Sequence, residues 1–219
     1  MLYNFCSALS GDCADGSLPF GGLVMDGAGH LFGTTEAGGT TGGGTVFSVL
    51  GKNETVIYNF CIDTEDCSDG DMPVAPVFLD DFGRIVGTTS RGGMAHSNGF
   101  GTLWTISGSS EQVLHSFNSK ANGADGYEPT AGVIEDSAGD IFGVTSSGGD
   151  ANQGGVLFEY RDGALHVLHD FGSAAGGADG CTPLGGLIMD AAGNLYGTTS
   201  ACGAGSNGDG GTVFELSPK

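Results

Sequence analysis

The sequence predicts an all-β fold built from four copies of one structural unit, and three observations lead to this prediction. Glycine supplies 44 of the 219 residues, which favours tight turns and disfavours long helices, because each glycine costs a helix roughly 1 kcal/mol. Hydrophobic residues make up 39% of the chain and include 13 Phe, which is enough for a packed core. The third observation is a pattern that returns every 54 to 57 residues.

Each copy opens on an apolar segment that ends in Phe and continues with a frame of fixed length. In the first copy the frame is Pro19, Asp26, Gly29 and Gly33, and no copy carries an insertion in it. The opening phenylalanines are Phe5, Phe60, Phe117 and Phe171. The chain is therefore predicted to be a single domain over residues 1–219. Its repeats are residues 1–55, 56–112, 113–166 and 167–219.

Each copy is predicted to hold four short antiparallel strands, rich in β-branched and aromatic residues. In the first copy the strands are residues 22–26, 30–35 and 44–49, followed by residues 56–60 that open the next copy. The Asp and Gly between the first two strands predict a tight hairpin turn. Four-stranded units repeated about an axis are blades, so the prediction is a four-bladed β-propeller. A β-solenoid would need shorter repeats.

The phase of the repeat predicts how the ring closes. The chain begins with a fourth strand, residues 2–5, and ends with a third strand, residues 211–216. The last blade lacks its outer strand unless this N-terminal strand supplies it, which would remove the unpaired edges. The same strand could instead come from a neighbouring molecule, by swapping or polymerisation.

The copies resemble the bacterial tandem repeats called GloVer. The resemblance covers essentially the whole chain and is carried best by residues 187–199 and 211–216. Copies two and three depart from the pattern, because residues 83–86 lack its aromatic residue and Val144 replaces its first Thr. The resemblance implies an extracellular, β-propeller-like protein and brings no established activity with it. No signal peptide or anchor is recognisable, so we expect a mature or truncated chain.

The charge balance excludes two classes of partner. The formal net charge is −20, with 6 basic against 26 acidic residues. Nucleic acids and anionic membranes both require a basic surface, so neither is expected as a partner. No run of 18 apolar residues is present, so no insertion into a membrane is expected.

The six cysteines predict three disulfides and an extracellular or cell-surface location. Three pairs follow from the loops in which they lie. They are Cys6–Cys13, Cys61–Cys67 and Cys181–Cys202. The alternatives are six unpaired thiols or a metal or redox site, although the Cys-x-x-Cys spacing of metal ligands is absent.

Each copy carries an Asp-Gly pair in the loop that precedes its Pro, which we call the Asp-Gly loop. These four aspartates are candidate ligands for Ca²⁺ or for sugar hydroxyls, although Asp-Gly is also a favoured turn pair. They are Asp15, Asp69, Asp125 and Asp179. The densest acidic stretch makes Asp66, Asp69 and Asp71 candidate metal ligands, since Ca²⁺ prefers carboxylate oxygens. The Asp-x-Asp-x-Asp-Gly spacing is missing, and Ca²⁺ is the only cofactor considered.

The remaining polar residues give no catalytic constellation, so no enzymatic activity is expected. His115 and His169 stand where two other copies have Tyr, which favours packing over catalysis. Trp104 replaces a strand Phe and is expected in the core. Asn53 begins a glycosylation sequon.

The function predicted first is a noncatalytic extracellular module for cell-surface structure, adhesion or self-assembly, including a filament subunit. Its partner would be a second copy, in a homo-oligomer or polymer. The alternative is a lectin-like propeller that binds a glycan at sites repeated between blades. A propeller hydrolase or lyase is the third reading.

Overall fold

The computed structural model describes residues 1–6, 13–93, 99–149, 152–205 and 210–217. The chain forms two compact units, Met1–Ser116 and Phe117–Lys219, which are described separately. Whether the two units make the single ring predicted for residues 1–219 stays a prediction. The described part of the chain consists of strands, turns and two short 3-10 helices, as the glycine content predicts.

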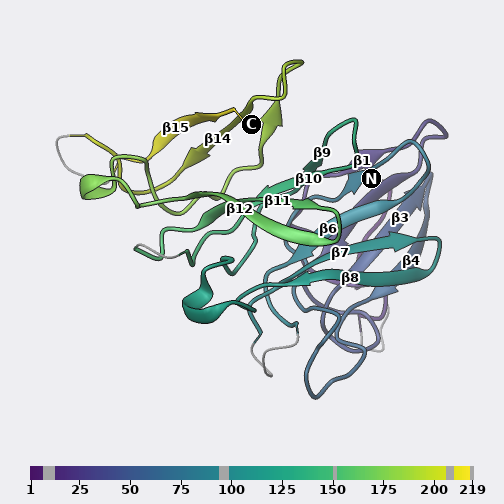
Figure 1. The fold of residues 1–219 in the computed structure, drawn as a ribbon. Coiled ribbons are helices and arrows are strands. Elements are labelled where there is room, and N and C mark those ends of the chain that lie inside the picture. Colours follow the sequence, from purple (N-terminus) through teal and green to yellow (C-terminus); the bar gives the residue numbers. More distant parts are fainter. Residues whose placement is uncertain (7–12, 94–98, 150–151, 206–209, 218–219) are drawn as a thin grey trace. The chain divides into compact units, whose positions relative to one another are not determined.

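The first unit contains two antiparallel sheets whose strands follow chain order (Figure 1). One sheet is β1 (Val24–Met25), β2 (Leu31–Thr35), β3 (Thr45–Leu50) and β4 (Asn53–Asn59). The other is β5 (Phe78–Leu79), β6 (Ile85–Thr89), β7 (Thr102–Ser107) and β8 (Ser110–Ser116). Each sheet takes three strands from one copy and its fourth strand from the segment that opens the next copy, as the sequence predicts.

The second unit repeats this architecture with one difference. Its first sheet is β9 (Ile134–Glu135), β10 (Ile141–Val144), β11 (Val156–Arg161) and β12 (Ala164–Asp170). Its second sheet is β13 (Ile188–Met189), β14 (Leu195–Thr199) and β15 (Thr212–Leu216). The 3-10 helices η1 (Ala121–Gly123) and η2 (Ala175–Gly177) lie in the loops before β9 and β13.

The last sheet has three strands in the described residues, and the fourth strand that the N-terminal segment is expected to supply is not seen there. Residues 2–5 form no strand. They belong to the other unit of the chain, so their pairing with β15 stays a prediction. The missing strand leaves Val213 of β15 83% exposed. The residues at its position in the other copies are fully buried, namely Val46, Leu103 and Leu157.

The hairpin between the first two strands of each copy has the predicted chemistry. In the first copy the carboxylate of Asp26 accepts hydrogen bonds from the N–H groups of Ala28 and His30, at 2.9 and 2.8 Å. Gly29 follows with a φ of +88°, which an L side chain rarely adopts. The same pattern recurs at Asp80, Asp136 and Asp190.

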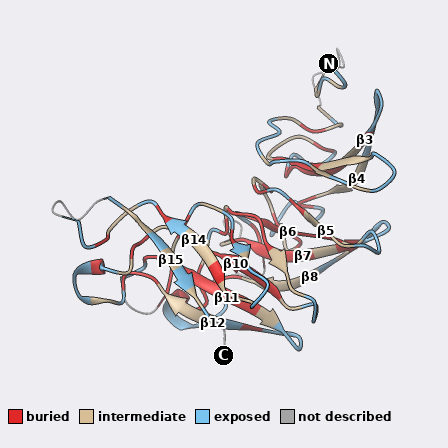
Figure 2. Ribbon diagram, turned by 90° about the horizontal axis from the view of Figure 1, so that it is seen from above, coloured by how far each residue is buried: buried red, intermediate tan, exposed pale blue. Residues whose placement is uncertain are grey.

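The core of each unit forms where the opening Phe of a copy packs on the third strand of that copy. Phe60 lies 5.2 Å from Trp104, and Phe171 lies 5.0 Å from Phe214, measured between ring centroids. Trp104 is fully buried, as predicted. Figure 2 shows the buried residues concentrated along inner strands such as β10 and β11. The chain is therefore all-β, with repeated antiparallel sheets of the kind that form propeller blades.

All three predicted disulfides are present. They join Cys6 to Cys13, Cys61 to Cys67 and Cys181 to Cys202. Bridges of this kind persist in oxidising surroundings, which supports an extracellular environment. In the part of the chain that the structure describes, no helix is long and apolar enough to span a membrane.

Candidate functional site

The four predicted site aspartates all turn their carboxylates into their own Asp-Gly loops. Each accepts hydrogen bonds from N–H groups of the chain just after the opening strand. Asp15 accepts the N–H of Cys6 at 3.0 Å, and Asp69 accepts that of Ile62 at 3.3 Å. Asp125 accepts the N–H of Ser119 at 3.0 Å and that of Lys120 at 3.1 Å.

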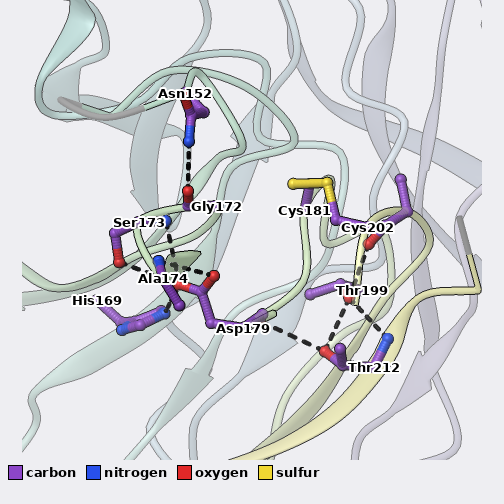
Figure 3. Close-up of polar contacts among 11 residues, drawn as sticks. Asn152, His169, Gly172, Ser173, Ala174, Asp179, Cys181, Thr199, Cys202 and Thr212 are labelled. Carbon is purple, nitrogen blue, oxygen red and sulfur yellow. Dashed lines mark hydrogen bonds and ion pairs between the residues drawn. A yellow bond between two sulfur atoms is a disulfide. The ribbon is translucent and has the colours of Figure 1, made fainter. Parts of the chain in front are cut away.

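Figure 3 shows the same arrangement around Asp179, whose carboxylate accepts the N–H groups of Ser173 and Ala174 at 3.2 and 3.1 Å. Asp69 and Asp125 are buried, with Asp125 fully enclosed. Each of the four carboxylates gives backbone N–H groups of its own loop a hydrogen-bond acceptor. They therefore brace their loops, and a role in binding a ligand stays a prediction.

A side chain from the segment that opens the copy adds a further polar contact to Asp15, Asp69 and Asp179. The hydroxyl of Tyr3 donates to Asp15 at 2.8 Å, and that of Tyr58 donates to Asp69 at 3.0 Å. In the fourth copy Nε2 of His169 lies 3.1 Å from Asp179. His169 thus makes the contact that Tyr makes elsewhere, as its position in the repeat predicts.

Two further carboxyl groups, which the sequence analysis missed, lie beside the Tyr–Asp pairs. Burial and the charge of Asp15 raise the pKa of Glu54, on β4, to about 6. Burial and the charge of Asp69 raise the pKa of Glu111, on β8, to about 7. One oxygen of each glutamate, Oε1, is buried without a hydrogen-bond partner.

Two other members of these clusters, Tyr3 and Asp69, also have raised pKa values. The hydrogen bond to Asp15, burial and nearby charge raise the pKa of Tyr3 to about 12. Burial also raises the pKa of Asp69 above its ordinary value, although the hydrogen bonds from Ile62 and Tyr58 act to lower it. Each Tyr–Asp–Glu cluster therefore holds two carboxyl groups that do not easily ionise together.

A signal for these glutamates is present in the repeat itself. Glu occurs two residues into the fourth strand in the copies whose opening strand carries Tyr. In the third copy, whose opening strand carries His115, the same position is the buried Leu165. Comparing the copies position by position, rather than seeking known motifs, would have found the pair.

The predicted metal ligands do not converge on one point. The carboxylate of Asp69 accepts hydrogen bonds from the N–H of Ile62 and the hydroxyl of Tyr58, whereas Asp66 is exposed. Burial raises the pKa of Asp71, with the charge of Arg91 acting in the opposite direction. Among the described residues no group of three or more metal-ligating side chains is assembled. A Ca²⁺ site stays a prediction, as does glycosylation of Asn53, which lies exposed at the start of β4.

A cavity of about 270 Å³ opens in the second unit where β15 lacks a neighbour. Its polar lining is His169, Asp179, Thr212 and Glu215. Figure 3 shows how Thr212 is held there: its Oγ1 lies 2.9 Å from Oγ1 of Thr199, close to the Cys181–Cys202 disulfide. The apolar lining is Leu157, Phe171, Ala178, Val213, Phe214 and Leu216. The cavity thus combines an apolar wall with an accessible His–Asp pair.

The solved structures that are similar to the chain include two described as gluconolactonases. One is a gluconolactonase from Xanthomonas campestris, with a TM-score of 0.53 and 14% identity, covering 88% of this chain and 57% of that protein. The other is a presumed gluconolactonase, with a TM-score of 0.52 and 13% identity, covering 90% of this chain and 63% of that protein. The chain thus spans about three fifths of their length. At this identity the likeness concerns the fold, which is propeller-like. No curated protein matches the chain.

These structures correct one expectation of the sequence analysis, that the protein is not an enzyme. Both similar proteins are described as gluconolactonases, so this fold is one on which hydrolytic sites are built. The missing catalytic motif was weak evidence, because the same fold supports unrelated sites and chemistries.

The sequence comparison agrees with the repeat that runs through all four sheets. The model of the Gloeobacter/Verrucomicrobia repeat matches residues 96–219, which is more than half of the chain. The same Phe, Pro, Asp and Gly frame continues through residues 1–95. The chain belongs to the Gloeobacter/Verrucomicrobia repeat family.

Proposed function

We propose that this protein is an extracellular module that assembles with copies of itself, by giving residues 1–5 as a strand to the open edge of β15 in a neighbour. The observation that carries the proposal is the exposure of Val213, whose equivalents in the other three sheets are fully buried. In each of those sheets a fourth strand pairs with the third and covers this position. Added strands are a common way for sheets to bind one another.

The repeat specifies the register of the added strand. Val46 pairs with Tyr58, Leu103 with His115, and Leu157 with His169. By the same register Val213 would pair with Tyr3 of the donated strand, and Thr212 with Asn4. A shift of one residue would turn the apolar side chains to the wrong face of the sheet.

Residues 1–5 have the composition that this role requires. Leu2 is half-exposed, and with Tyr3 and Phe5 it lines an apolar groove of about 390 Å³ in the first unit. A donated strand would keep Phe5 on its own sheet, where its ring lies 4.7 Å from that of Phe47, while its backbone pairs elsewhere. The net charge of −20 opposes loose aggregation, so association would depend on such a specific contact.

The location follows from the disulfides. Three bridges and no free thiol occur among the described cysteines, and such a set survives outside the reducing interior of a cell. Self-association outside the cell suits a structural or adhesive role at the cell surface.

The test is the mass of the native particle, measured by light scattering over a range of concentrations. We expect particles larger than the 21.8 kDa chain. Deletion of residues 1–5 should reduce them to monomers, and so should Val213→Asp, which places a charge on the open edge. The control is Val24→Thr on β1, which leaves that edge unchanged. A wild-type protein that stays monomeric at high concentration would refute the proposal.

A second candidate function is hydrolysis of a sugar lactone, favoured by the cavity beside His169 and Asp179. A histidine held by a carboxylate can remove a proton from water, which then adds to the lactone carbonyl and opens the ring to a hydroxy acid. Release of acid from gluconolactone, compared between the wild type and His169→Phe, tests it. Equal rates for the two proteins would exclude this site.

A further inference from the structure

One hairpin turn breaks the repeat without any structural need. Between the turn Asp and Gly, three copies carry two small residues, whereas the second copy carries Asp81 and Phe82. The other three pairs are Gly27-Ala28, Ser137-Ala138 and Ala191-Ala192. The backbone hydrogen bonds of the turns in the first and second copies are the same. The N–H of Phe82 donates to Asp80 at 2.9 Å, and the N–H of Ala28 donates to Asp26 at 2.9 Å. Phe82 is 96% exposed, so its ring adds nothing to the core.

The turn borders a cleft of about 550 Å³ within the first unit. The cleft lies between the hairpin turns of the first and second copies, and its lining mixes aromatic, apolar and carboxylate groups. It is lined by Met25, Asp26, Gly27, Phe32, Leu79, Asp80, Asp81, Phe82 and Gly83. Phe82 therefore stands at the rim of a formed depression, next to oxygen acceptors.

The carboxylates of the cleft differ in how many hydrogen bonds they already accept. Burial acts to raise the pKa of Asp26 and of Asp80, but the hydrogen bonds from the turn and from His30 or Arg84 hold both below the ordinary value. Both are therefore ionised and largely occupied by the turn, with His30 at 2.8 Å and Arg84 at 3.0 Å. Asp81 lies exposed, comes directly before Phe82 in the chain, and lines the same cleft.

We propose that this cleft binds a neutral saccharide, with the ring of Phe82 against the apolar face of a pyranose and the carboxylate of Asp81 accepting hydrogen bonds from its hydroxyl groups. A sugar ring presents C–H groups on one face and hydroxyl donors around its rim. An exposed aromatic ring next to an acceptor-only carboxylate complements both features. The ligand would lie on the surface of the first unit.

Other ligand classes fit this cleft less well. An anionic ligand would meet three carboxylates on a protein with a net charge of −20. A purely apolar ligand would bury the carboxylate of Asp81 without a hydrogen-bond donor, which is unfavourable. A basic peptide would find the carboxylate of Asp80 already paired with Arg84 and that of Asp26 already hydrogen-bonded to His30. A neutral saccharide can contact the ring of Phe82 and donate hydrogen bonds to the carboxylate of Asp81 at the same time.

The repeat supplies variants that the turn is known to accept. Phe82→Ala installs the residue found at this turn position in the other three copies, and Asp81→Ser installs the residue of the third copy. The control is Phe20→Ala, which removes a phenylalanine that is 69% exposed and lies outside the lining of this cleft. The probes are soluble dextran, mannan, xylan and cellohexaose, with alginate as the anionic counterpart and a polylysine peptide as the cationic one.

Binding is measured by affinity electrophoresis and by titration calorimetry. We expect the wild type to bind at least one neutral probe, Phe82→Ala to weaken that binding by roughly tenfold or more, and Asp81→Ser to weaken it by several fold. Phe20→Ala should bind as the wild type does. Light scattering of Phe82→Ala should show unchanged assembly, which separates this proposal from the preceding one.

Three results would overturn the proposal. The first is that no neutral probe binds. The second is neutral binding that Phe82→Ala leaves intact, which would place the sugar elsewhere. The third is binding of alginate or polylysine alone, lost in Phe82→Ala, which would make the cleft a site for a charged partner.

Discussion

The identity of one side chain in the opening strand is linked to that of another in the fourth strand. Tyr3 and Tyr58 are accompanied by Glu54 and Glu111, whereas His115 is accompanied by Leu165. A tyrosine is neutral at ordinary pH, so a neighbouring Glu places two carboxyl groups around a single hydroxyl. In the first unit, therefore, an Asp and a Glu beside one tyrosine repel each other when both are ionised. The third copy, with His115 and Leu165, lacks this repulsion.

This arrangement predicts how the stability of the first unit depends on pH. The pKa of Glu111 is about 7 in the folded protein against an ordinary value of 4.5, so the folded state keeps a proton that the unfolded chain releases. Its contribution is complete below pH 4.5 and is lost as the pH rises through about 7. After discounting for solvent around this half-buried group, we expect a loss of about 1–2 kcal/mol.

The measurement is urea unfolding at pH 5 and pH 8, followed by the fluorescence of Trp104. This residue is the only tryptophan in the chain and lies in the core of the same unit. Glu111→Gln should remove most of the difference between the two pH values, and Glu65→Gln, in an exposed loop, should leave it. An equal dependence in all three proteins would show that Glu111 is not its source.

A second prediction concerns the loop carboxylates. Asp125→Ala should destabilise the second unit by roughly 2–4 kcal/mol, because it removes a fully buried carboxylate that accepts the N–H groups of Ser119 and Lys120. Thermal unfolding by circular dichroism measures it. Ser137→Ala, which installs the residue of the fourth copy at an exposed turn position of the same unit, is the control and should change stability by less than about 0.5 kcal/mol. A small effect at Asp125 would mean that water satisfies this loop.

Among the elements, the hairpins and the third strands were predictable, since both are determined by local contacts. The Asp and Gly of each turn act within five residues, and β3 and β7 are short runs rich in β-branched and aromatic residues whose first three residues are all buried. The first strands are shorter than predicted, with two paired residues in β1 instead of five. Gly21, just before β1, lies so close to the carbonyl of Ala75 in the next copy that a Cβ would be 2.8 Å from its oxygen. That contact is not visible in the sequence of one copy.

The second strand of each sheet carries a glycine under the aromatic ring of the third strand, and this predicts the effect of a single methyl group. A Cβ on Gly87 would lie 2.4 Å from the ring of Trp104. Gly87→Ala should therefore cost roughly 1–3 kcal/mol and shift the fluorescence of Trp104. Gly27→Ala, where a Cβ meets no atom within 4 Å, is the matched control. Equal stability of the two variants would contradict the packing described for β6 and β7.

On the scale of the whole molecule, the four sheets were predictable because the repeat states them four times, and the disulfides because two of them occupy equivalent loops and only Cys181 and Cys202 then remain. Glu54 and Glu111 were not, because their role depends on charge and burial contributed by separate loops. The expectation of a noncatalytic protein was wrong for a related reason. A repeat defines a scaffold, and catalytic sites are built on scaffolds by individual residues. The importance of Phe82 and Val213 could not be predicted either, because it depends on the solvent exposure of their side chains, which only the structure shows.

The central claim is that the edge of β15 receives residues 1–5 of a neighbouring chain, and cysteine trapping tests it most directly. Tyr3→Cys and Val213→Cys, introduced together, should form a disulfide, since residues opposite each other in an antiparallel pair lie close enough for one. The six native cysteines are already bridged and do not compete. The pair Leu2→Cys and Val213→Cys is one residue out of register and should react poorly. The account predicts covalent dimers and longer ladders on a gel run without reductant. A bond formed only within single chains, or no bond at all, would contradict it.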